Sequence, residues 1–384
     1  MSIYKSKWLL SFILFSLITP NLLLTQTWFE MVRVVLFILS SSIVLLLIIF
    51  NKRISKYLIW VILFYSVILL SVYINNGSIA RFFTGTGPYI VLCIVVVLWM
   101  EHSPETLLDA VAIMQIYVYI NLLTVLLFPG GMYAISRQRD FWFLGYRNFH
   151  IRFILPVTAF SLVRSYYKYG KITPDTVVLI VTAIVTMLSI GSATGLVGFT
   201  IFIVMVLLFC SRRKPLPRFV NLYTIMIIST VLFFIIVVFG RQDLFAFLIE
   251  GILGRDLTLT GRLLIWERTM ILISGNPIFG IGFAGRQVEF SRYMLYSNAT
   301  HPHNYILYIL ALGGFLLLVI TGWLYFSAAK KLKVSNGSMY SKIMLFAIAS
   351  FLIMGISESL TEAHLLYPMI LFACHIDVFI NEES

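Results

Sequence analysis

The chain has 384 residues, of which 60% are hydrophobic and only 11% are charged. A mean hydropathy of +0.97 excludes an ordinary soluble domain, in which about a quarter of residues are charged, and indicates a polytopic membrane protein. The formal net charge is +12, and the positive charges gather in short segments between apolar runs.

Apolar runs predict about twelve transmembrane spans, because a helix needs roughly 20 such residues to cross the hydrocarbon. The spans lie near residues 8–24, 31–50, 57–74, 86–100, 106–128, 149–167, 174–191, 193–210, 219–239, 304–327, 340–357 and 363–380. The first is not expected to be a cleaved signal peptide, because it lacks a small-residue cleavage site. Between the seventh and eighth, Gly191 to Gly195 is typical of a turn.

The basic segments predict the orientation, because short cytoplasmic loops are enriched in lysine and arginine. Clusters within residues 5–7, 52–56, 164–171, 212–218 and 330–342 fall on the same side of the predicted spans. Both termini are therefore predicted to be cytoplasmic. The sequence predicts an all-α bundle, a single integral membrane domain over 1–384, in which residues 240–303 form an outward-facing loop between spans 9 and 10.

The predicted outward half carries arginine but no lysine. A planar guanidinium can bind two oxygens of one phosphate, which an ammonium group cannot do, so these arginines predict phosphate recognition. The alternative is that they pair with acidic side chains. The outward arginines are Arg33, Arg81, Arg137, Arg139, Arg147, Arg152, Arg241, Arg255, Arg262, Arg268, Arg286 and Arg292, and the acidic residues are Glu30, Asp140, Asp243, Glu250, Asp256, Glu267, Glu289, Glu358 and Glu362.

The loop 240–303 is the predicted catalytic or binding segment, because charged residues and helix breakers between apolar spans mark functional positions. Apolar positions from Asp243 to Leu253 predict a helix lying in the membrane interface. A second helix is predicted to begin after Gly261 and to reach about Ile273, where Gly275 to Pro277 end it.

Arg262, Trp266 and Thr269 share one face of this second helix, since they are spaced by four and three residues. An arginine and a tryptophan on one face suit a phosphate and a sugar ring. The alternative for Trp266 is an anchor at the membrane interface. Glu267 lies on the helix surface beside Leu263 and is included among the candidate catalytic residues.

His303 and Asn304 stand at the start of the tenth predicted span. A histidine at the outer end of a transmembrane helix titrates near neutral pH and could remove a proton from a sugar hydroxyl. The alternative is a solvated interfacial histidine without a catalytic role. His301 lies in the bent segment just before and is a candidate for substrate binding.

Further arginines complete the predicted site. The segment 137–148 mixes cations with aromatic rings, and Arg152 begins the next span, so Arg147 and Arg152 are candidate substrate-binding residues. Arg268 and Arg286 of the loop are candidates of the same kind.

No metal or other cofactor is expected. The histidines outside the loop share no metal-ligand spacing. No strand is predicted before Gly280-Ile281-Gly282, so these glycines are not a nucleotide-binding fingerprint and predict tight backbone turns instead.

The ordered set of these residues resembles the O-antigen ligase and polymerase superfamily of bacterial membranes, over roughly residues 140–325. The matching residues are Gly261-Arg262 with Trp266, Asn276-Pro277 with Gly280 and Gly282, and His303-Asn304 followed by Gly313-Gly314, with weaker echoes at Gly145 to Asn148 and Ser192 to Gly195. The resemblance implies an enzyme that moves an oligosaccharide from an undecaprenyl diphosphate carrier to an acceptor hydroxyl on the outer face, without a metal or nucleotide.

The resemblance also implies roles for individual residues. Arg262 would contact the diphosphate of the carrier, and His303 would activate the acceptor or hold the leaving group. One departure concerns the short turn before the eighth span, where the family often has an arginine directly after the serine and this chain has Ala193. Arg147 or Arg152 could supply the missing phosphate contact.

The first functional expectation is a polymerase that joins undecaprenyl-diphosphate-linked repeat units of an O-antigen, capsule or exopolysaccharide. The alternative is a ligase that passes the finished glycan to lipid A core or another acceptor. A flippase or transporter fits less well, because the spans carry few charges at their centres and show no repeat. Expected partners are the lipid-linked oligosaccharide, the bilayer of the bacterial cytoplasmic membrane, and a chain-length regulator and a flippase of the same pathway, but no nucleic acid.

Overall fold

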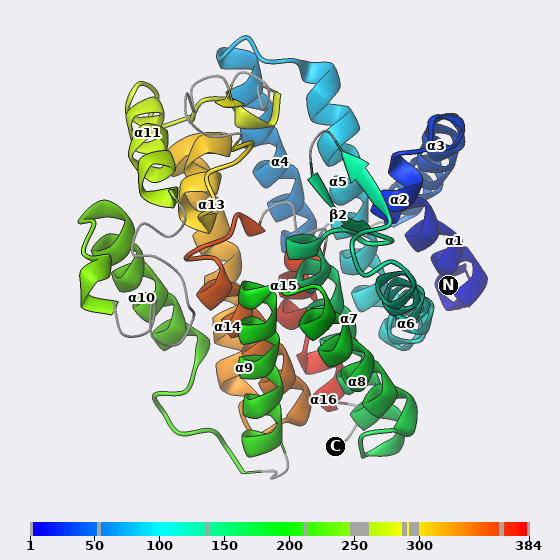
Figure 1. Cartoon of the computed structure of the whole chain (residues 1–384). Coiled ribbons are helices and arrows are strands. Elements are labelled where there is room, and N and C mark those ends of the chain that lie inside the picture. The colour runs from blue at the N-terminus through cyan, green and yellow to red at the C-terminus, as the bar shows by residue number, and fades with distance from the viewer. Residues whose placement is uncertain are drawn as a thin grey trace.

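The computed structural model describes residues 3–51, 55–135, 138–210, 214–245, 261–285, 290–291, 299–360 and 365–381. They form a bundle of helices of unequal length (Figure 1). The α-helices are α1 (Lys7–Leu17), α2 (Asn21–Leu24), α3 (Thr27–Phe50), α4 (Lys56–Ile74), α5 (Ile79–His102), α6 (Pro104–Leu127), α7 (His150–Tyr169), α8 (Pro174–Ser189), α9 (Ala193–Phe209), α10 (Leu222–Phe233), α11 (Arg262–Ser274), α13 (Tyr305–Val334), α14 (Met339–Met354), α15 (Leu366–Cys374) and α16 (Asp377–Asn381). Shorter helical turns are η1 (Ile3–Lys5), η2 (Arg147–Phe149), η3 (Phe234–Val238), η4 (Gln242–Phe245) and η6 (Phe283–Gly285).

Each predicted span contains at least one of these helices. By length and composition, α3, α4, α5, α6 and α13 are long and apolar enough to cross a membrane. The first predicted span is divided, because α1 ends at Leu17 and α2 begins only at Asn21, after Pro20. The helical membrane fold is thus supported, while the number of twelve crossings stays a prediction.

One departure from the all-α prediction follows α6. The strands β1 (Tyr133–Ile135), β2 (Gln138–Trp142) and β3 (Gly145–Tyr146) form a small antiparallel sheet in the order β1-β2-β3. Aromatic rings pair across it, since the ring of Phe141 lies 5.4 Å from those of both Tyr133 and Tyr146. Such pairs stabilise neighbouring strands, so the mixed cationic and aromatic segment expected as a loop is partly a sheet.

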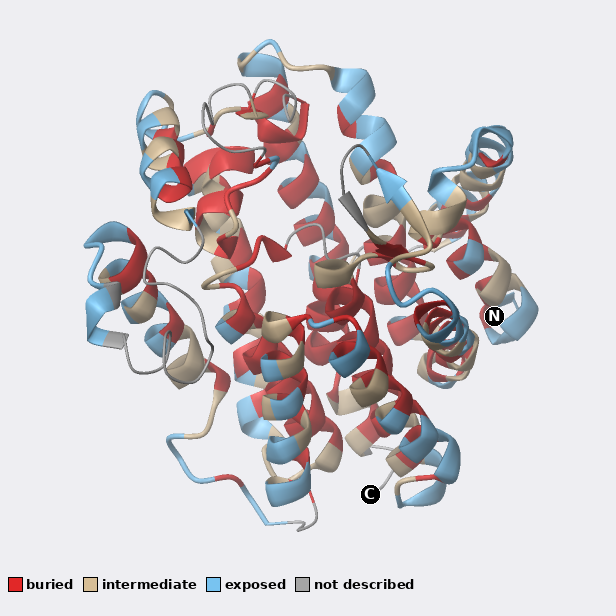
Figure 2. Ribbon diagram, in the orientation of Figure 1, coloured by how far each residue is buried: buried red, intermediate tan, exposed pale blue. Residues whose placement is uncertain are grey.

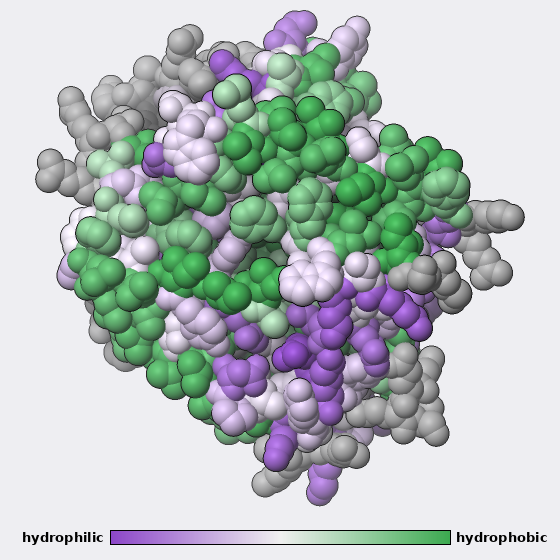
Figure 3. Space-filling model, turned by 90° about the vertical axis from the view of Figure 1, so that its right-hand side faces the viewer, coloured by the Kyte–Doolittle hydropathy of each residue, from purple (hydrophilic) through white to green (hydrophobic). Residues whose placement is uncertain are grey.

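The centre of the bundle consists of α7, α14 and α15. Most residues of these three helices are buried (Figure 2). The outer helices, α3 among them, include many exposed apolar residues. In α3 the most apolar window is only 17% buried. The side of the molecule that includes α3 is mostly apolar, with hydrophilic side chains gathered toward the bottom (Figure 3). An exposed apolar surface of this extent suits contact with lipid rather than water.

Arg152 and Lys168 lie near opposite ends of α7. Lys7 and Lys168 both pair with Asp109 near the start of α6. Arg152 lies in the first turn of α7, sixteen residues before Lys168. At 1.5 Å per residue, the two positions are separated by about 24 Å along the helix axis.

The predicted second helix of the loop is confirmed as α11. It begins directly after Gly261, which has a positive φ of 79°, and it ends at Ser274. The predicted interfacial helix over Asp243 to Leu253 falls largely on residues 246–260, which lie outside the described residues. The part that is described forms the short turn η4 (Gln242–Phe245).

The chain after α11 packs into a break in α13. Gly313 and Gly314 leave helical geometry, and the backbone N–H of Phe315 donates to the carbonyl of Pro277 at 2.8 Å. Gly280 and Gly314 both have positive φ, 71° and 63°, and approach each other's backbone. The predicted tight turns are therefore confirmed, and the helix expected to continue through Gly313-Gly314 is interrupted. This contact ties α11 to the helix that follows His303.

Replacing Gly314 by Ala should destabilise the protein by more than about 2 kcal/mol. The new Cβ would lie 2.3 Å from the carbonyl oxygen of Ile278, and the residue would keep its unfavourable positive φ. Gly322→Ala is the matched control in α13, because a Cβ there meets nothing within 4 Å and should add roughly 0.5–1 kcal/mol of stability. Thermal unfolding of the purified variants in detergent measures both effects, and equal midpoints would contradict the proposed close packing.

Candidate functional site

The carboxylate of Glu358 is the centre of the candidate site. It lies in the turn after α14, and its side chain is only 5% exposed. Nη2 of Arg262 donates to Oε1 at 3.2 Å. Nη2 of Arg152 lies 3.6 Å from Oε2, and Nδ1 of His303 lies 3.9 Å from the same oxygen. Two arginines and a histidine that are far apart in the sequence therefore surround one buried carboxylate.

Local structure fixes both arginines. Arg152 lies in the first turn of α7, its side chain is 4% exposed, and its guanidinium stacks over the ring of Phe149 at 4.5 Å. Arg262 is the first residue of α11, and its Nη1 also donates to the carbonyl of Ser357. The start of α11 is thus joined to the turn that carries Glu358.

A polar chain links the cluster to the turn between α8 and α9. The side-chain amide of Asn148 donates to Oε1 of Glu358 at 3.3 Å, and the hydroxyl of Ser192 donates to Oδ1 of Asn148 at 3.4 Å. The predicted Gly/Ser turn is confirmed, with Gly191 at a φ of +63°. Ala193 therefore lies next in the chain to this network.

The two histidines of the loop lie directly beside each other. Their ring centroids are 4.0 Å apart, and the backbone N–H of His303 donates to Nδ1 of His301 at 3.3 Å. His303 has a φ of +52°, a conformation that costs a residue other than glycine roughly 1–3 kcal/mol and is found mostly at functional sites. Asn304 caps α13 by accepting from the N–H of Leu307, and its amide donates to the carbonyl of Ile356.

The pKa values of Glu358 and of His301 are both lowered in the site, which leaves the acid charged and the histidine neutral. Burial alone would raise the pKa of Glu358, but His303, Arg262 and Arg152 together lower it to about 2. Burial lowers the pKa of His301 well below its usual range, and the charges of His303 and Arg152 act in the same direction. At neutral pH, Glu358 is therefore ionised and His301 is neutral.

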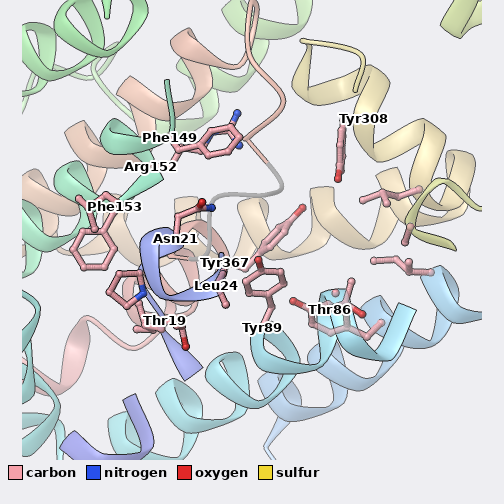
Figure 4. Close-up of a pocket in the computed structure, with 18 of the residues that line it drawn as sticks. Thr19, Asn21, Leu24, Thr86, Tyr89, Phe149, Arg152, Phe153, Tyr308 and Tyr367 are labelled. Carbon is pink, nitrogen blue, oxygen red and sulfur yellow. The ribbon is translucent and has the colours of Figure 1, made fainter. Parts of the chain in front are cut away.

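Arg152 also lines a cavity of about 320 Å³. Phe149 and Arg152 lie on one side of this space and Tyr308 on the other, with Tyr89 and Tyr367 between them (Figure 4). The walls come from the α1–α2 connection and from α4, α5, α6, α7, α13 and α15. Aromatic rings with hydroxyl groups, next to a guanidinium, suit a ligand that combines sugar and phosphate groups.

The structure brings together five of the residues predicted from the sequence and leaves others apart. Around Glu358 it places Arg152, Arg262, His301, His303 and, one residue further along, Asn304.

Of the remaining candidates, Arg147 pairs with Asp140 at 3.6 Å instead. On α11, Trp266 is fully buried and Glu267 is exposed, and Arg268 is partly buried. Arg286 lies outside the described residues.

Sequence reasoning missed Glu358 and Arg81 as members of the site. The sequence grouped Glu358 only with the other acids that could pair with arginines, although an acid between two apolar helices is itself a signal of function. Arg81 belongs to the outward arginines but follows no motif, and it lines the cavity only because α5 packs beside α4. Within the described residues, no group of three or more His, Cys, Asp or Glu side chains is placed to hold a metal ion.

One protein-family model matches part of the chain. Residues 178–322 match the family model described as O-Antigen ligase. This match confirms the resemblance to the O-antigen ligase and polymerase superfamily stated from the sequence. The matched region includes Arg262, His301 and His303, whereas Arg152 and Glu358 lie outside it. No curated protein matched the chain.

The low pKa of Glu358 predicts how stability depends on pH. A carboxylate whose pKa falls on folding stabilises the folded state above its ordinary pKa of 4.5, and this contribution is lost as the pH falls through about 2. Glu358→Gln should therefore lower the unfolding midpoint at about pH 7, by an amount equivalent to roughly 3 kcal/mol, and the difference from wild type should shrink toward about pH 3.

The matched control for this experiment is Asp140→Asn, which removes a half-exposed carboxylate paired with Arg147. Its effect should be below about 1 kcal/mol. Thermal unfolding in detergent at several pH values measures both, and a difference between wild type and Glu358→Gln that does not change with pH would contradict the assignment.

Proposed function

We propose that this protein is a polysaccharide polymerase that joins undecaprenyl-diphosphate-linked oligosaccharide repeat units on the outer face of the bacterial cytoplasmic membrane. The observation that carries the proposal is the convergence of Arg152, Arg262 and His303 on one buried carboxylate beside a cavity. The family match supports a membrane glycosyltransferase of the O-antigen ligase and polymerase type.

The charge of the cluster suits a diphosphate leaving group. Arg152 and Arg262 contribute two positive charges against the single negative charge of Glu358, and His303 adds another when protonated. Positively charged donors held in a site of low dielectric stabilise negative charge that develops during bond cleavage. The cluster could provide this stabilisation without a metal ion, so we propose a metal-independent reaction.

The proposed reaction transfers a glycosyl group to an acceptor hydroxyl. A new bond forms between the acceptor oxygen and the anomeric carbon, while the bond from that carbon to the phosphate oxygen breaks. The undecaprenyl diphosphate leaves with the electron pair, held by Arg262 and Arg152. His303 accepts the proton of the attacking hydroxyl, and Asn304 holds the start of α13 so that His303 stays beside Glu358.

Arg152 is the better candidate for the second phosphate contact that the family usually takes from the turn at Ala193. It lies at the carboxylate of Glu358 and on the cavity wall, and Asn148 links this carboxylate to the same turn. Arg147 is half-exposed and paired with Asp140. The orientation predicted from the lysines, with both termini in the cytoplasm, places this end of α7 on the outer side.

Most of the remaining sequence candidates keep their proposed places in the same mechanism. On α11, exposed Glu267 and partly buried Arg268 remain proposed contacts of the donor, as does Arg286. The ring of Trp266 is fully buried, so it would support the packing of α11 rather than contact the donor. A chain-length regulator and a flippase of the same pathway are proposed as partners.

A ligase is the second candidate, because the family model that matches is itself described as O-Antigen ligase. Donor, arginines and histidine would be the same in both reactions. Only the acceptor differs, being another repeat unit for a polymerase and lipid A core or another molecule for a ligase.

Alanine in place of Arg152, Arg262 or His303 should each reduce product formation by about 100-fold or more, because each removes a group that acts on the transition state. Arg147→Ala should reduce it by less than about 10-fold. The assay uses purified protein in lipid nanodiscs with an undecaprenyl-diphosphate-linked repeat unit. Full activity of Arg152→Ala together with an inactive Arg147→Ala would show that Arg147, and not Arg152, makes the second phosphate contact.

Glycan length in cells separates the two candidate functions. Cells deleted for the gene should carry single repeat units, and wild-type protein, but neither Arg262→Ala nor His303→Ala at matched membrane expression, should restore long chains. Long undecaprenyl-linked polymer in the deletion strain would support the ligase instead. Repeat units trapped on the cytoplasmic side would support a flippase and contradict both enzymes.

A further inference from the structure

Glu358 has a position in this site that neither motif matching nor the family match assigns. Its carboxylate is contacted from three separate stretches of chain, which contain Asn148 with Arg152, Arg262, and His303. Asp109 also pairs with three cationic side chains, but these include Lys168 near the opposite end of α7 and have no part in the proposed reaction.

The two carboxylate oxygens of Glu358 contact different partners. Oε1 accepts from Arg262 and Asn148, while Oε2 faces Arg152 and His303. The carboxylate therefore holds the two guanidinium groups on different oxygens and keeps them apart at a fixed separation. Without it, the two guanidinium groups would repel each other, and Arg152, at 4% side-chain exposure, would lose the anionic partner that it has in Glu358.

We propose that Glu358 is the positioning residue of the site, whose carboxylate sets the separation and orientation of Arg152, Arg262 and His303 for the diphosphate and the acceptor. This inference rests on the proposed function. Glu358 acts through these three groups rather than on the substrate itself.

Two further observations fit this role. Glu358 is followed by buried Ser359 and Leu360, so the turn that carries it is anchored in the protein core. Arg262 is bound by both the Ser357 carbonyl and the Glu358 carboxylate, so α11 is located by the same turn. A diphosphate would therefore meet guanidinium groups whose positions were set before it bound, which is the condition for efficient electrostatic stabilisation.

A positioning role predicts that binding and turnover change in opposite directions in Glu358→Gln. The amide has nearly the same shape but no charge, so the cluster becomes more positive and should bind undecaprenyl diphosphate about 3- to 10-fold more tightly. The arginines and His303 lose their shared anchor, so kcat for transfer should fall about 100-fold. A residue needed only for folding would not produce this split between tighter binding and slower turnover.

The experiment uses full-length protein in nanodiscs, with undecaprenyl diphosphate as the binding probe and the lipid-linked repeat unit as the donor. Glu358→Asp keeps the charge but withdraws the carboxylate by one methylene, so it should bind the probe as wild type does and show an intermediate kcat. Glu101→Gln is the matched control, because Glu101 also faces a histidine, His375, at 3.6 Å but lies at the end of α5. Its Kd and kcat should equal those of wild type.

The outcomes separate this inference from the proposed function. If the wild type is active and Glu358→Gln keeps its kcat, Glu358 does not position the site and the polymerase proposal stands. If Glu358→Gln loses probe binding and kcat in proportion to its folded fraction, its role is structural and the inference fails. If wild type neither binds undecaprenyl diphosphate nor uses the donor, the proposed function itself fails.

Discussion

A charge that is buried in an apolar bundle must be compensated by other charges, and this requirement organises the site of this protein. Glu358 is nearly inaccessible to solvent, and the side chains that compensate it come from the start of α7, the start of α11 and the segment before α13. Leaving any one of these charges unpaired would cost several kcal/mol. The packing of three helix ends and the chemistry of the site are therefore fixed by the same contacts, and neither can change without the other.

Backbone contacts of α13 with the chain after α11 help to hold Arg262 and His303 in this arrangement. The chain after α11 enters the break at Gly313-Gly314 in α13, so that α11 and His303 are held against one helix. His303 itself has a positive φ, which persists only where surrounding contacts impose it. Rigid placement of Arg262 and His303 thus results from glycine-dependent backbone contacts some distance from either side chain.

Much of the fold follows from local sequence patterns, and much of the site does not. Apolar runs located a helix in each predicted span, and Gly261 with Gly275 to Pro277 set the limits of α11 closely. The sheet from β1 to β3 was missed because its stability comes from aromatic pairs across strands that a hydropathy reading does not count. Glu358 was missed for a related reason: a single carboxylate in a short turn has no periodicity or spacing, and only the tertiary structure shows that two arginines meet it. Sequence reasoning likewise placed Arg147 and Arg152 on equal terms, and only their different neighbours distinguish them.

The position of Arg152 limits how an anionic substrate can reach the site. Its side chain is 4% exposed, it faces Glu358 on one side, and it forms part of the cavity wall on the other. An anion that contacts this guanidinium must therefore either enter the cavity or displace the carboxylate. Displacement would leave Glu358 ionised and without one of its cations, which is unfavourable because its pKa of about 2 reflects how strongly these cations stabilise it. Entry into the cavity keeps both pairings, since a guanidinium has five N–H donors and can serve two anions at once. The cavity beside Tyr89, Tyr308 and Tyr367 is consequently the place where we expect a phosphate group of the donor to meet Arg152.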